Sequence, residues 1–563
     1  MRSAPIRAAT VGMLLALILA RPVNAGQAGD LPVPGDAGPV GEEPRPSDDE
    51  LYTGSDPNRN LRRHEPFRVV EHPAAVDARS LGIRLTPVAI ELVQGGQLVR
   101  TLPFDGGRPV TFEEVARAVD DPAWIFAVSP GVFGLRAAFV QAPGTHVRFA
   151  APGTTELRLA IDPPGVFLGG KGPGTTARFE GVKVTSWDLA ARRPSQNVED
   201  SIRPFVLYES GARLDIAHSE MAYLGSDHVG SYGVSWRLEG ATGEVTDSVF
   251  HHCFFAVYTY EAKDLVFRRN VFRDNLYYGL DPHDATTGLV AEANEAFGNG
   301  SHGFIFSKYV TDGVLSGNHA HHNGGNGIVL DANSDRNLVT GNRVEDNQGD
   351  GIVLLGSSHN TVEDNVVSGN RIGVRANKPG QGNLVRRNRI EGNHIGVHAY
   401  DNATGLRLED NEIEDSTQAG VIFEAAGATL RNGSVAGGDN GIEVRQAASV
   451  SGVEVRRARD GVVVGKGASA RLDGLRIEVD RVGIRVEPGG SAAVAGTRVV
   501  ARTPTRGRVH LALGNSLAKP ERPRPLPWLA FAGVVAVICA VVLEVLAHSR
   551  DRRTRRVPAV DPS

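Results

Sequence analysis

Short runs of alternating apolar and polar residues recur along most of this chain, separated by glycine, asparagine or aspartate. Asn342-Arg-Val-Glu-Asp and Asn388-Arg-Ile-Glu-Gly are typical, and each run holds only three to five alternating residues. A period of two over so few residues predicts short β-strands, because an amphipathic helix needs a longer run with a period of about 3.6.

The runs repeat at a nearly fixed spacing. Two series of asparagines recur every 23 or 24 residues, and glycines that precede an apolar run follow a similar beat. The members are Asn270, Asn294, Asn318, Asn342, Asn365, Asn388 and Asn411; Asn275, Asn299, Asn323, Asn347, Asn370 and Asn393; and Gly279, Gly303, Gly327, Gly351, Gly373, Gly396, Gly420, Gly441, Gly461 and Gly483. Gly233 and Ala256 extend the glycine series upstream, which gives twelve coils.

A repeat of 20 to 24 residues with three short strands predicts one coil of a parallel β-helix. Equivalent residues of successive coils then lie about 4.8 Å apart, and the asparagine series form side-chain ladders. Leucine-rich repeats have a similar length, but the leucine-dominated consensus that they need is missing here. The sequence therefore predicts an all-β protein built on a parallel β-helix.

The segments outside the repeats divide the chain further. Thr111-Phe-Glu-Glu has a capping-box pattern and predicts a short amphipathic helix through Val119, which we expect to cap the first coil. The expected divisions are a signal peptide (1–25), a disordered linker (26–60), an N-terminal cap region (61–130), the β-helix (131–502), a second linker (503–526), a transmembrane helix (527–548) and a basic cytoplasmic tail (549–563).

Both ends of the chain carry targeting patterns. Arg2 and Arg7 precede an apolar run from Ala8 to Ala20, and Val23-Asn-Ala25 follows as a small-residue cleavage site, as in a secretory signal peptide. The segment from Trp528 to Ala547 is apolar over the length that a bilayer core requires, apart from Glu544, and arginines follow it. The sequence therefore predicts a single-pass protein of the cell membrane whose β-helix lies outside the cytoplasm.

Composition narrows the class of partner. Glycine makes up 67 of 563 residues and aromatic residues only 6%, which suits tight turns around a narrow core. The chain has two cysteines, and Cys539 lies in the expected membrane segment, so no disulfide is expected to stabilise the exported domain. The formal net charge of -5 argues against nucleic-acid binding, so local cations must meet any anionic ligand.

One coil departs from the repeat. Gly279-Leu-Asp-Pro-His-Asp284 stands where two later coils read Gly327-Ile-Val-Leu and Gly351-Ile-Val-Leu. Carboxylates, an imidazole and a proline lower strand propensity, and such local inconsistencies tend to mark functional sites. His283 is therefore the candidate centre of a site.

Several stretches around this motif resemble one family. They are Tyr232-Gly-Val-Ser-Trp236, Val257-Tyr-Thr-Tyr-Glu-Ala262, Tyr278-Gly-Leu-Asp-Pro-His-Asp284, His302-Gly303 and Leu330-Asp-Ala-Asn-Ser334. Together they resemble the bacterial periplasmic mannuronan C5-epimerases over roughly residues 200–400. The resemblance implies a right-handed parallel β-helix that inverts uronate residues in an anionic polysaccharide. We expect no cofactor and no metal in this reaction, and an exopolysaccharide synthesis or export machinery is a candidate partner.

The resemblance also implies roles for two residues. The motif histidine, His283, is the implied base, and an arginine one coil later is implied to neutralise the substrate carboxylate. This chain carries Lys308 at that position. Lysine offers a point charge instead of a bidentate clamp, so the change points either to a different uronate or to lost activity.

The chemistry of C5 inversion leads to the same pair of groups. Removing the C5 proton of a hexuronate places negative charge beside a carboxylate, so a cation must neutralise that carboxylate first. Counting from the coil glycines puts His283 and Lys308 at the same corner, one coil apart. An imidazole suits a general base, either Asp281 or Asp284 would orient it, and Pro282 stiffens the turn.

The fourth residue after each coil glycine defines a candidate substrate groove. This position holds Arg237, Tyr260, His283, Ser307 and Asp331 in five successive coils, and Tyr258 is expected to flank Asp281. A polymer on this face would find a cation for a carboxylate and tyrosines for sugar faces. The alternative interpretation is an ordinary polar outer face.

Two other functions remain open from the residues alone. A polyuronate lyase begins with the same proton abstraction and then expels the 4-oxygen, which Tyr260 would protonate. A non-enzymatic metal or glycan binder is suggested by Asn318-His-Ala-His-His322, where His319 and His321 point the same way, although no third ligand of suitable spacing is evident. A glycosidase fits less well, because its paired acids are not evident.

Overall fold

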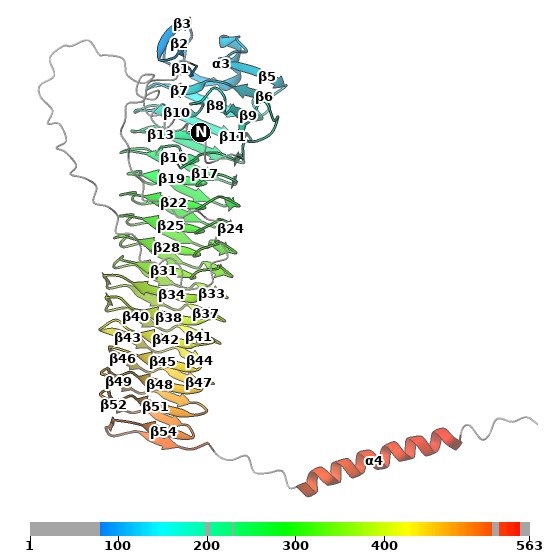
Figure 1. Ribbon diagram of the computed structural model, residues 1–563, viewed down its shortest axis with the longest axis vertical. Coiled ribbons are helices and arrows are strands. Elements are labelled where there is room, and N and C mark those ends of the chain that lie inside the picture. Colours follow the sequence, from blue (N-terminus) through cyan, green and yellow to red (C-terminus); the bar gives the residue numbers. More distant parts are fainter. Residues whose placement is uncertain (1–78, 197–202, 228–229, 521–527, 552–563) are drawn as a thin grey trace, which may run out of the picture. The chain divides into compact units, whose positions relative to one another are not determined.

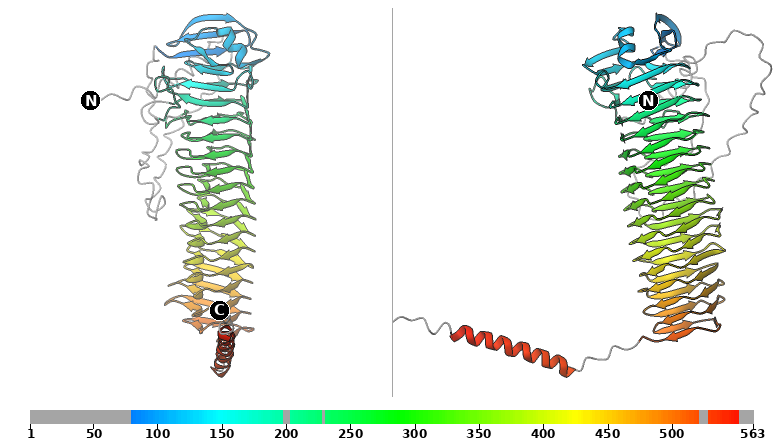
Figure 2. Two further views of the ribbon diagram at one scale, coloured as in Figure 1. Left: turned by 90° about the vertical axis from the view of Figure 1, so that its right-hand side faces the viewer. Right: turned by 180° about the vertical axis from the view of Figure 1, so that it is seen from behind.

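The described part of the first of two compact units, Met1–Leu517, is built from three columns of short strands, here called sheets A, B and C. In this computed structural model, residues 79–196, 203–227, 230–520 and 528–551 are described. Each coil of the chain contributes one strand to each sheet in turn, and equivalent strands pair in parallel with those of the next coil (Figures 1 and 2). The predicted all-β parallel β-helix is confirmed.

Sheet A carries the functional motif. Its strands are β1 (Leu81–Leu85), β2 (Ala89–Gln94), β3 (Gln97–Pro103), β7 (Ala138–Gln141), β10 (Leu168–Lys171), β13 (Val206–Glu209), β16 (Val234–Arg237), β19 (Val257–Tyr260), β22 (Leu280–His283), β25 (Phe304–Ser307), β28 (Ile328–Asp331), β31 (Ile352–Leu355), β34 (Ile372–Asn377), β38 (Ile395–Ala399), β42 (Ala419–Phe423), β45 (Asn440–Val444), β48 (Asp460–Val464), β51 (Val482–Val486) and β54 (Thr503–Arg506).

Sheet B follows sheet A in each coil. Its strands are β4 (Pro109–Thr111), β8 (His146–Ala150), β11 (Thr176–Glu180), β14 (Arg213–Ala217), β17 (Glu244–Thr246), β20 (Val266–Arg268), β23 (Val290–Glu292), β26 (Val314–Ser316), β29 (Leu338–Thr340), β32 (Thr361–Glu363), β36 (Leu384–Arg386), β40 (Arg407–Glu409), β43 (Ala428–Arg431), β46 (Ala447–Ser451), β49 (Ser469–Asp473), β52 (Ser491–Ala495) and β55 (Val509–Leu511).

Sheet C closes each coil. Its strands are β5 (Ile125–Ser129), β6 (Val132–Leu135), β9 (Glu156–Ala160), β12 (Lys183–Trp187), β15 (Glu220–Ala222), β18 (Val249–His251), β21 (Val271–Arg273), β24 (Glu295–Phe297), β27 (His319–His321), β30 (Arg343–Glu345), β33 (Val366–Ser368), β37 (Arg389–Glu391), β41 (Glu412–Glu414), β44 (Ser434–Ala436), β47 (Glu454–Arg456), β50 (Arg476–Glu478), β53 (Arg498–Val500) and β56 (Ser516–Ala518). A further pair, β35 (Gly380–Gln381) and β39 (Ala403–Thr404), lies between sheets A and B in the chain.

The solenoid is longer than the glycine beat predicts. Within the described residues, sheet A has about sixteen parallel strands, from β7 to β54, against the twelve coils that were counted. In the early coils Phe167 and Phe205 occupy the glycine position and stack with their ring centroids 4.9 Å apart. In the last coil Pro504 takes that place beside Gly483. The strands β54, β55 and β56 therefore extend into the segment expected as a linker, 503–526.

The asparagine ladders are present as predicted. In the first ladder the side-chain amide of Asn270 donates to Oδ1 of Asn294 at 2.9 Å, and Asn294 repeats the contact to Asn318 at 3.0 Å. The same Oδ1 of Asn294 accepts the backbone N–H of Asn270 at 2.9 Å. The second ladder begins with Asn275, which donates to Asn299 at 2.8 Å. The buried polar groups at each asparagine corner are thus hydrogen-bonded to the next coil. These bonds fix the register of neighbouring coils.

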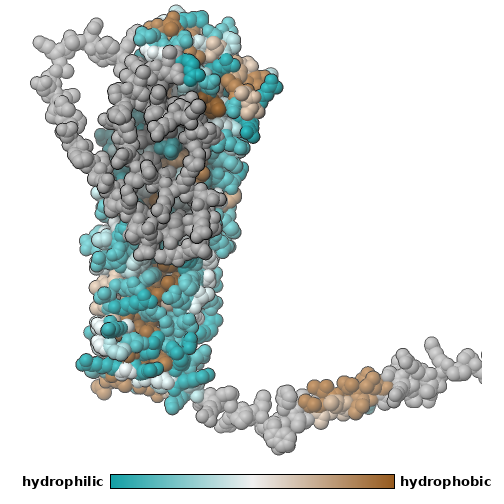
Figure 3. Space-filling model, viewed as in Figure 1, coloured by the Kyte–Doolittle hydropathy of each residue, from teal (hydrophilic) through white to brown (hydrophobic). Residues whose placement is uncertain are grey.

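Apolar side chains from all three sheets fill the interior of the coils. Alternate residues of each strand point inward, as in β27, where Ala320 is fully buried between the more exposed His319 and His321. The described part of the face seen in Figure 3 is mostly hydrophilic, with hydrophobic residues among the hydrophilic ones. The outward positions are therefore free to vary in chemistry from coil to coil.

A short helix covers the first coils, as predicted. Helix α3 spans Phe112–Val119, and Thr111 caps it: Oγ1 of Thr111 accepts the N–H of Glu114 at 3.2 Å, and the carboxylate of Glu114 accepts the N–H of Thr111 at 2.7 Å. Phe112 stacks on Phe149 of β8 with ring centroids 5.3 Å apart. This packing shields the end of the core from water.

The second unit, Ala518–Ser563, contains helix α4 (Trp528–Asp551). A transmembrane helix over 527–548 was expected here. Across the part of the chain that the structure describes, no helix is found that is long and apolar enough to cross a membrane. The expected signal peptide (1–25), the linker 26–60 and most of the basic tail lie outside the described residues.

Candidate functional site

The Asp-Pro-His-Asp motif forms strand β22 and the turn that follows it in sheet A. Pairing with β19 places Tyr258 beside Asp281 and Tyr260 beside His283. Leu280 and Pro282 are buried, while His283 faces outward with its side chain 22% exposed. Proline lacks the N–H that a central strand needs, and β22 pairs with β25 only at its two ends, Leu280 with Phe304 and His283 with Ser307.

The predicted column of outward residues is confirmed by the strand register. Arg237 pairs with Tyr260, Tyr260 with His283, His283 with Ser307, and Ser307 with Asp331. Five coils therefore present these side chains in one line along the solenoid.

His283 is held by a neighbouring carboxylate. Nδ1 of His283 makes a very short contact with Oδ2 of Asp284, and the hydroxyl of Thr286 donates to the His283 carbonyl at 2.9 Å. Burial by itself lowers the pKa of His283, but the hydrogen bond with Asp284 and the charge of Asp281 outweigh it and raise the pKa above 6.5. Asp284, not Asp281, is thus the carboxylate in contact with the imidazole.

Asp281 is the most deeply buried polar group of the motif. It is 1% exposed, and burial raises the pKa of its carboxyl to about 7, against the opposing charge of His283 and a hydrogen bond with Ser307. Its Oδ1 has no hydrogen-bond partner among the described residues. A buried and unpaired carboxyl oxygen beside an imidazole is typical of a functional site, because it costs stability that nothing in the fold returns.

Lys308 lies at the corner that follows Ser307, one coil after Asp284. The N–H of Ala285 donates to the Lys308 carbonyl at 3.1 Å, which sets the two turns side by side. Lys308 has a left-handed backbone with φ 56°, and its positive charge opposes, without cancelling, the rise in the pKa of both His283 and Tyr260. The predicted arrangement of His283 and Lys308 at one corner is confirmed.

Tyr258 borders the imidazole on the side of the preceding coil. The two ring centroids lie 5.4 Å apart with an angle of 35° between the planes. Tyr258 is 8% exposed, and burial, together with the charge of Asp281, raises the pKa of its hydroxyl. The phenol therefore keeps its proton at any physiological pH.

Tyr258 belongs to an aromatic cluster that the sequence reasoning did not identify. Its ring lies 4.8 Å from Tyr232 and 6.2 Å from Phe255, and Phe255 stacks on Tyr278 at 5.0 Å. The signal was the crowding of aromatic residues in positions 254–278 of a chain that has only 6% aromatic residues. The cluster fixes the ring of Tyr258 beside His283.

Arg237 and Tyr260 continue the line away from Lys308. The guanidinium of Arg237 lies over the ring of Tyr260, 5.6 Å from its centroid. Nε of Arg237 is buried without a hydrogen-bond partner among the described residues. The column thus holds one cation, Arg237, which Tyr260 separates from His283, and it ends in the acidic Asp331 beyond Ser307.

In the later coils of sheet A, several arginines form ion pairs with buried aspartates. Arg375 and Arg371 both contact Asp350, which is fully buried, at 2.5 and 2.9 Å. Arg481 contacts Asp460 in the same way at 2.5 Å. Another feature, a concavity of about 470 Å³ near Arg471 on sheet B, is far along the chain from the motif and is lined mostly by alanine, serine and glycine. The candidate site is the stretch of sheet A around His283, because the imidazole, the buried carboxyl of Asp281 and Lys308 gather there.

Comparisons with known proteins agree with a β-helix fold and with the resemblance to mannuronan C5-epimerases. A family model described as right handed beta helix region matches residues 225–367 and 332–435. Mannuronan C5-epimerase of Pseudomonas syringae pv. tomato is 34% identical over 200 residues, 32% of this chain and 36% of that protein. Mannuronan C5-epimerase AlgG of Azotobacter vinelandii is 33% identical over 235 residues, 39% of this chain and 43% of that protein. The chain spans less than half the length of these curated relatives.

A solved structure extends the likeness of fold. The crystal structure of the periplasmic alginate epimerase AlgG superposes with a TM-score of 0.51 at 24% identity, over 72% of this chain and 84% of that chain. Identity at this level shows a shared fold. The resemblance to mannuronan C5-epimerases, first seen in the Asp-Pro-His-Asp motif, is confirmed, and so is the right-handed hand of the β-helix.

Proposed function

We propose that this protein is a C5-epimerase that inverts uronate residues within an anionic polysaccharide. The observation that carries the proposal is the site on β22, where an imidazole, a buried carboxyl with an unpaired oxygen and a lysine meet on the outer face of sheet A. The identity to mannuronan C5-epimerases supports the substrate class, a polyuronate.

The reaction begins with proton removal from C5. In its neutral form His283 accepts this proton through Nε2, because Nδ1 is engaged by Asp284. Lys308 binds the substrate carboxylate and neutralises it, so that negative charge can develop at the adjacent carbon. Asp284 holds the tautomer and orientation of the ring and stabilises the imidazolium that forms.

Inversion requires a proton from the other face of the sugar. Tyr258 is suited to supply it, because its hydroxyl stays protonated and its ring borders the imidazole at 5.4 Å. Asp281, Pro282, Ser307 and Asp331 shape the floor of the site, and Arg237 and Tyr260 bind neighbouring sugars of the polymer. The column of outward residues provides the direction in which the polymer lies.

Product analysis in deuterated water tests the proposal. The purified β-helix domain, incubated with polymannuronate, should introduce deuterium at C5 of the inverted sugar residues without shortening the polysaccharide. A lyase would instead form an unsaturated uronate that absorbs in the ultraviolet, with falling polymer length. That outcome, or the absence of any reaction on several polyuronates, would overturn the epimerase assignment.

The location in the cell is part of the same proposal. We infer an extracytoplasmic β-helix from the secretory pattern of residues 1–25 and from the likeness to a periplasmic epimerase. A C-terminal tether by 527–548 rests on the sequence pattern alone, and contact with a polymer export machinery rests on the resemblance to the epimerases. Deletion of residues 519–563 should release an anchored protein into the soluble fraction, and an unchanged distribution would remove the tether from the proposal.

A further inference from the structure

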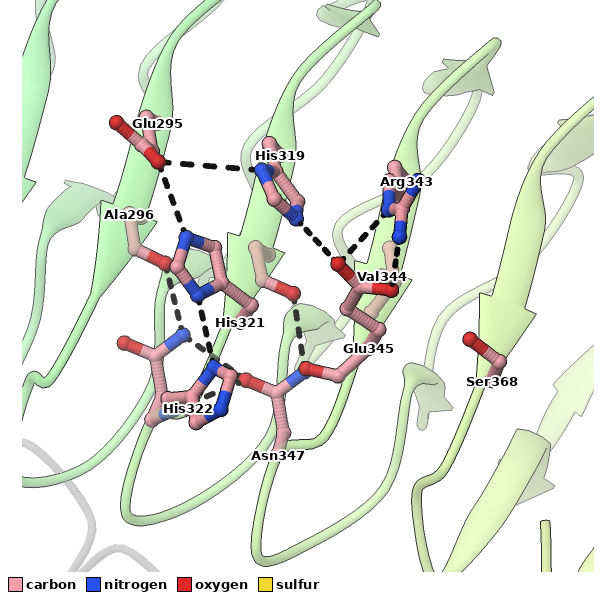
Figure 4. A network of polar contacts seen from close by, with 12 residues as sticks. Glu295, Ala296, His319, His321, His322, Arg343, Val344, Glu345, Asn347 and Ser368 are labelled. Carbon is pink, nitrogen blue, oxygen red and sulfur yellow. Dashed lines mark hydrogen bonds and ion pairs between the residues drawn. The ribbon is translucent and has the colours of Figure 1, made fainter. Parts of the chain in front are cut away.

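Sheet C carries a second group of histidines and carboxylates, on a different sheet from His283. Glu295 of β24 pairs with His319 of β27, and the outward residue two positions on in β27 is His321 (Figure 4). Ala320 between the histidines is fully buried, so both imidazoles point outward. The sequence showed the two histidines but no third ligand, and the fold supplies it from the preceding coil.

The three side chains converge on one point. Their candidate ligand atoms all lie within 4.8 Å of one another. Nε2 of His321 is 3.1 Å from Oε1 of Glu295, and Nδ1 of His319 is 3.9 Å from the same oxygen. The imidazole rings are stacked with centroids 4.1 Å apart. A single ion between the rings and the carboxylate would contact all three groups.

The nitrogen atoms that face away from this point are already held. Nε2 of His319 contacts Oε1 of Glu345 at 2.8 Å, and Arg343 fixes Glu345 with two hydrogen bonds of 2.8 and 2.7 Å. Nδ1 of His321 contacts Nδ1 of His322 at 2.9 Å. Metal-bound histidines generally use their second nitrogen in this way, which orients the ring and directs the other lone pair at the ion.

A related cluster in an earlier coil shows which residue is decisive. There Nε2 of His251 contacts Oε1 of Glu220 at 3.0 Å, and Nδ1 of His251 contacts His252 at 2.8 Å, as at His321. The position that corresponds to His319 is occupied by Val249, and Lys183 contacts the Glu220 carboxylate at 2.7 Å. In that cluster only the imidazole of His251 contacts the carboxylate, and Lys183 is a resident cation there, so it offers no complete ligand set.

We propose that Glu295, His319 and His321 bind a divalent transition-metal ion, with zinc as the representative ion. Two imidazoles and one carboxylate form a common ligand set for zinc with a fourth position open to water. Oxygen-preferring ions such as calcium suit this nitrogen-rich set poorly. The ion would tie β24 to β27 on sheet C, away from the outward column of sheet A.

Titration of zinc into the full chain without an affinity tag, after removal of metal by EDTA, tests the site. We expect about one equivalent of tight binding and an upward shift of Tm that grows with zinc concentration. His319→Val, which copies the Val249 arrangement, and Glu295→Gln should each weaken binding by about 100-fold or more, since each removes one of three ligands. Calcium should produce neither effect.

His251→Ala is the matched control, because it removes an imidazole of similar surroundings from the incomplete cluster. It should retain the zinc affinity of the unaltered protein, and Tm values in EDTA should show that every variant is folded. Equal zinc binding in the unaltered protein and in His319→Val, or no stoichiometric binding in the unaltered protein, would overturn the proposal.

Discussion

The same two coils carry two clusters of histidine and carboxylate with different environments. On sheet A, His283 contacts Asp284 and lies within the electrostatic reach of the buried Asp281, which is 1% exposed and has its pKa raised to about 7. On sheet C, His321 meets Glu295, whose side chain is 42% exposed. The residue types are alike, and the burial of the carboxyl groups differs.

This difference separates two kinds of chemistry. A buried carboxyl near pKa 7 and an imidazole with a raised pKa exchange protons close to neutral pH, which suits acid–base catalysis. An exposed carboxylate is accessible to ions from solution, which suits a cation. The coil repeat fixes the direction in which the side chains point. The burial of the carboxyl group then determines whether the cluster suits acid–base catalysis or cation binding.

The largest expected effect separates the two histidine clusters by activity. His283→Gln should lower turnover by about 10²–10⁴-fold, because it removes the general base while keeping a polar side chain of similar size. His321→Gln should change turnover by less than about twofold, since sheet C takes no part in the proposed reaction. Rates of C5 deuterium incorporation measure both, and circular dichroism checks the fold. Substantial activity in His283→Gln would show that the base lies elsewhere.

The second effect concerns charge at the corner of sheet A. Lys308→Met should reduce turnover by about 10²–10³-fold, because the developing charge beside the substrate carboxylate loses its counter-ion. Lys308→Arg should retain activity, because a positive charge at this corner is the required property. Steady-state kinetics on one polyuronate compares the pair. Equal turnover in Lys308→Met and the unaltered protein would remove the neutralising role of Lys308.

The third effect is a shift in pH dependence. His283 acts as a base only when neutral, and its pKa lies above 6.5, so kcat/KM should fall as the pH is lowered through a value above 6.5. The charge of Asp281 contributes to this raised pKa, so Asp281→Asn should move the acidic limb of the profile to lower pH. The two groups titrate as a coupled pair, and the profile reports the pair. An unmoved limb would show that Asp281 does not influence the base.

Stability should respond to the same substitution. The folded protein keeps the Asp281 proton up to about pH 7, while the ordinary pKa of this group is 3.8. The stabilising contribution of this proton is therefore complete below pH 3.8 and is lost as the pH rises through about 7. Asp281→Asn should raise Tm relative to the unaltered protein more at pH 8 than at pH 4, as thermal unfolding at both pH values would show.

The smallest expected effect is a loss of stability that leaves the functions of the His283 cluster and the His319–His321 cluster equally unchanged. Asn318→Ala removes one rung of the first ladder and leaves the backbone N–H of Asn294 without its acceptor, which should cost about 1–3 kcal/mol of unfolding free energy. Denaturant unfolding measures this loss. Turnover and zinc affinity should both stay within about twofold below the unfolding transition, so a selective loss of one would contradict an evenly shared scaffold.

Much of this structure could be predicted from the sequence because asparagine and glycine recur at a nearly fixed spacing at the corners of the coils. The ladders, the outward column at His283 and the capping helix at Thr111 all follow from local spacing. The coils marked by Phe167 and Pro504 were missed because a glycine was required, although the position needs only a residue that fits the coil before it.

The side-chain environment could not be predicted in the same way. Spacing placed both Asp281 and Asp284 near His283, but only the turn after β22 brings Asp284 to Nδ1. Spacing also gave no reason to join Glu295 to His319 and His321, since 24 residues separate the first two and the pairing of β24 with β27 brings them together. Contacts between coils depend on the register of whole strands, which no single motif encodes.

The asparagine ladders allow whole coils to be inserted or deleted, in evolution or by engineering. Asn342 bonds to Asn318 on one side and to Asn365 on the other through the same amide geometry. Removing the stretch from Asn342 to Asp364 would therefore allow Asn318 to meet Asn365 with the ladder unbroken. Solenoids built from such exchangeable units can lengthen or shorten by whole coils on one side of an active site while the site keeps its own neighbours.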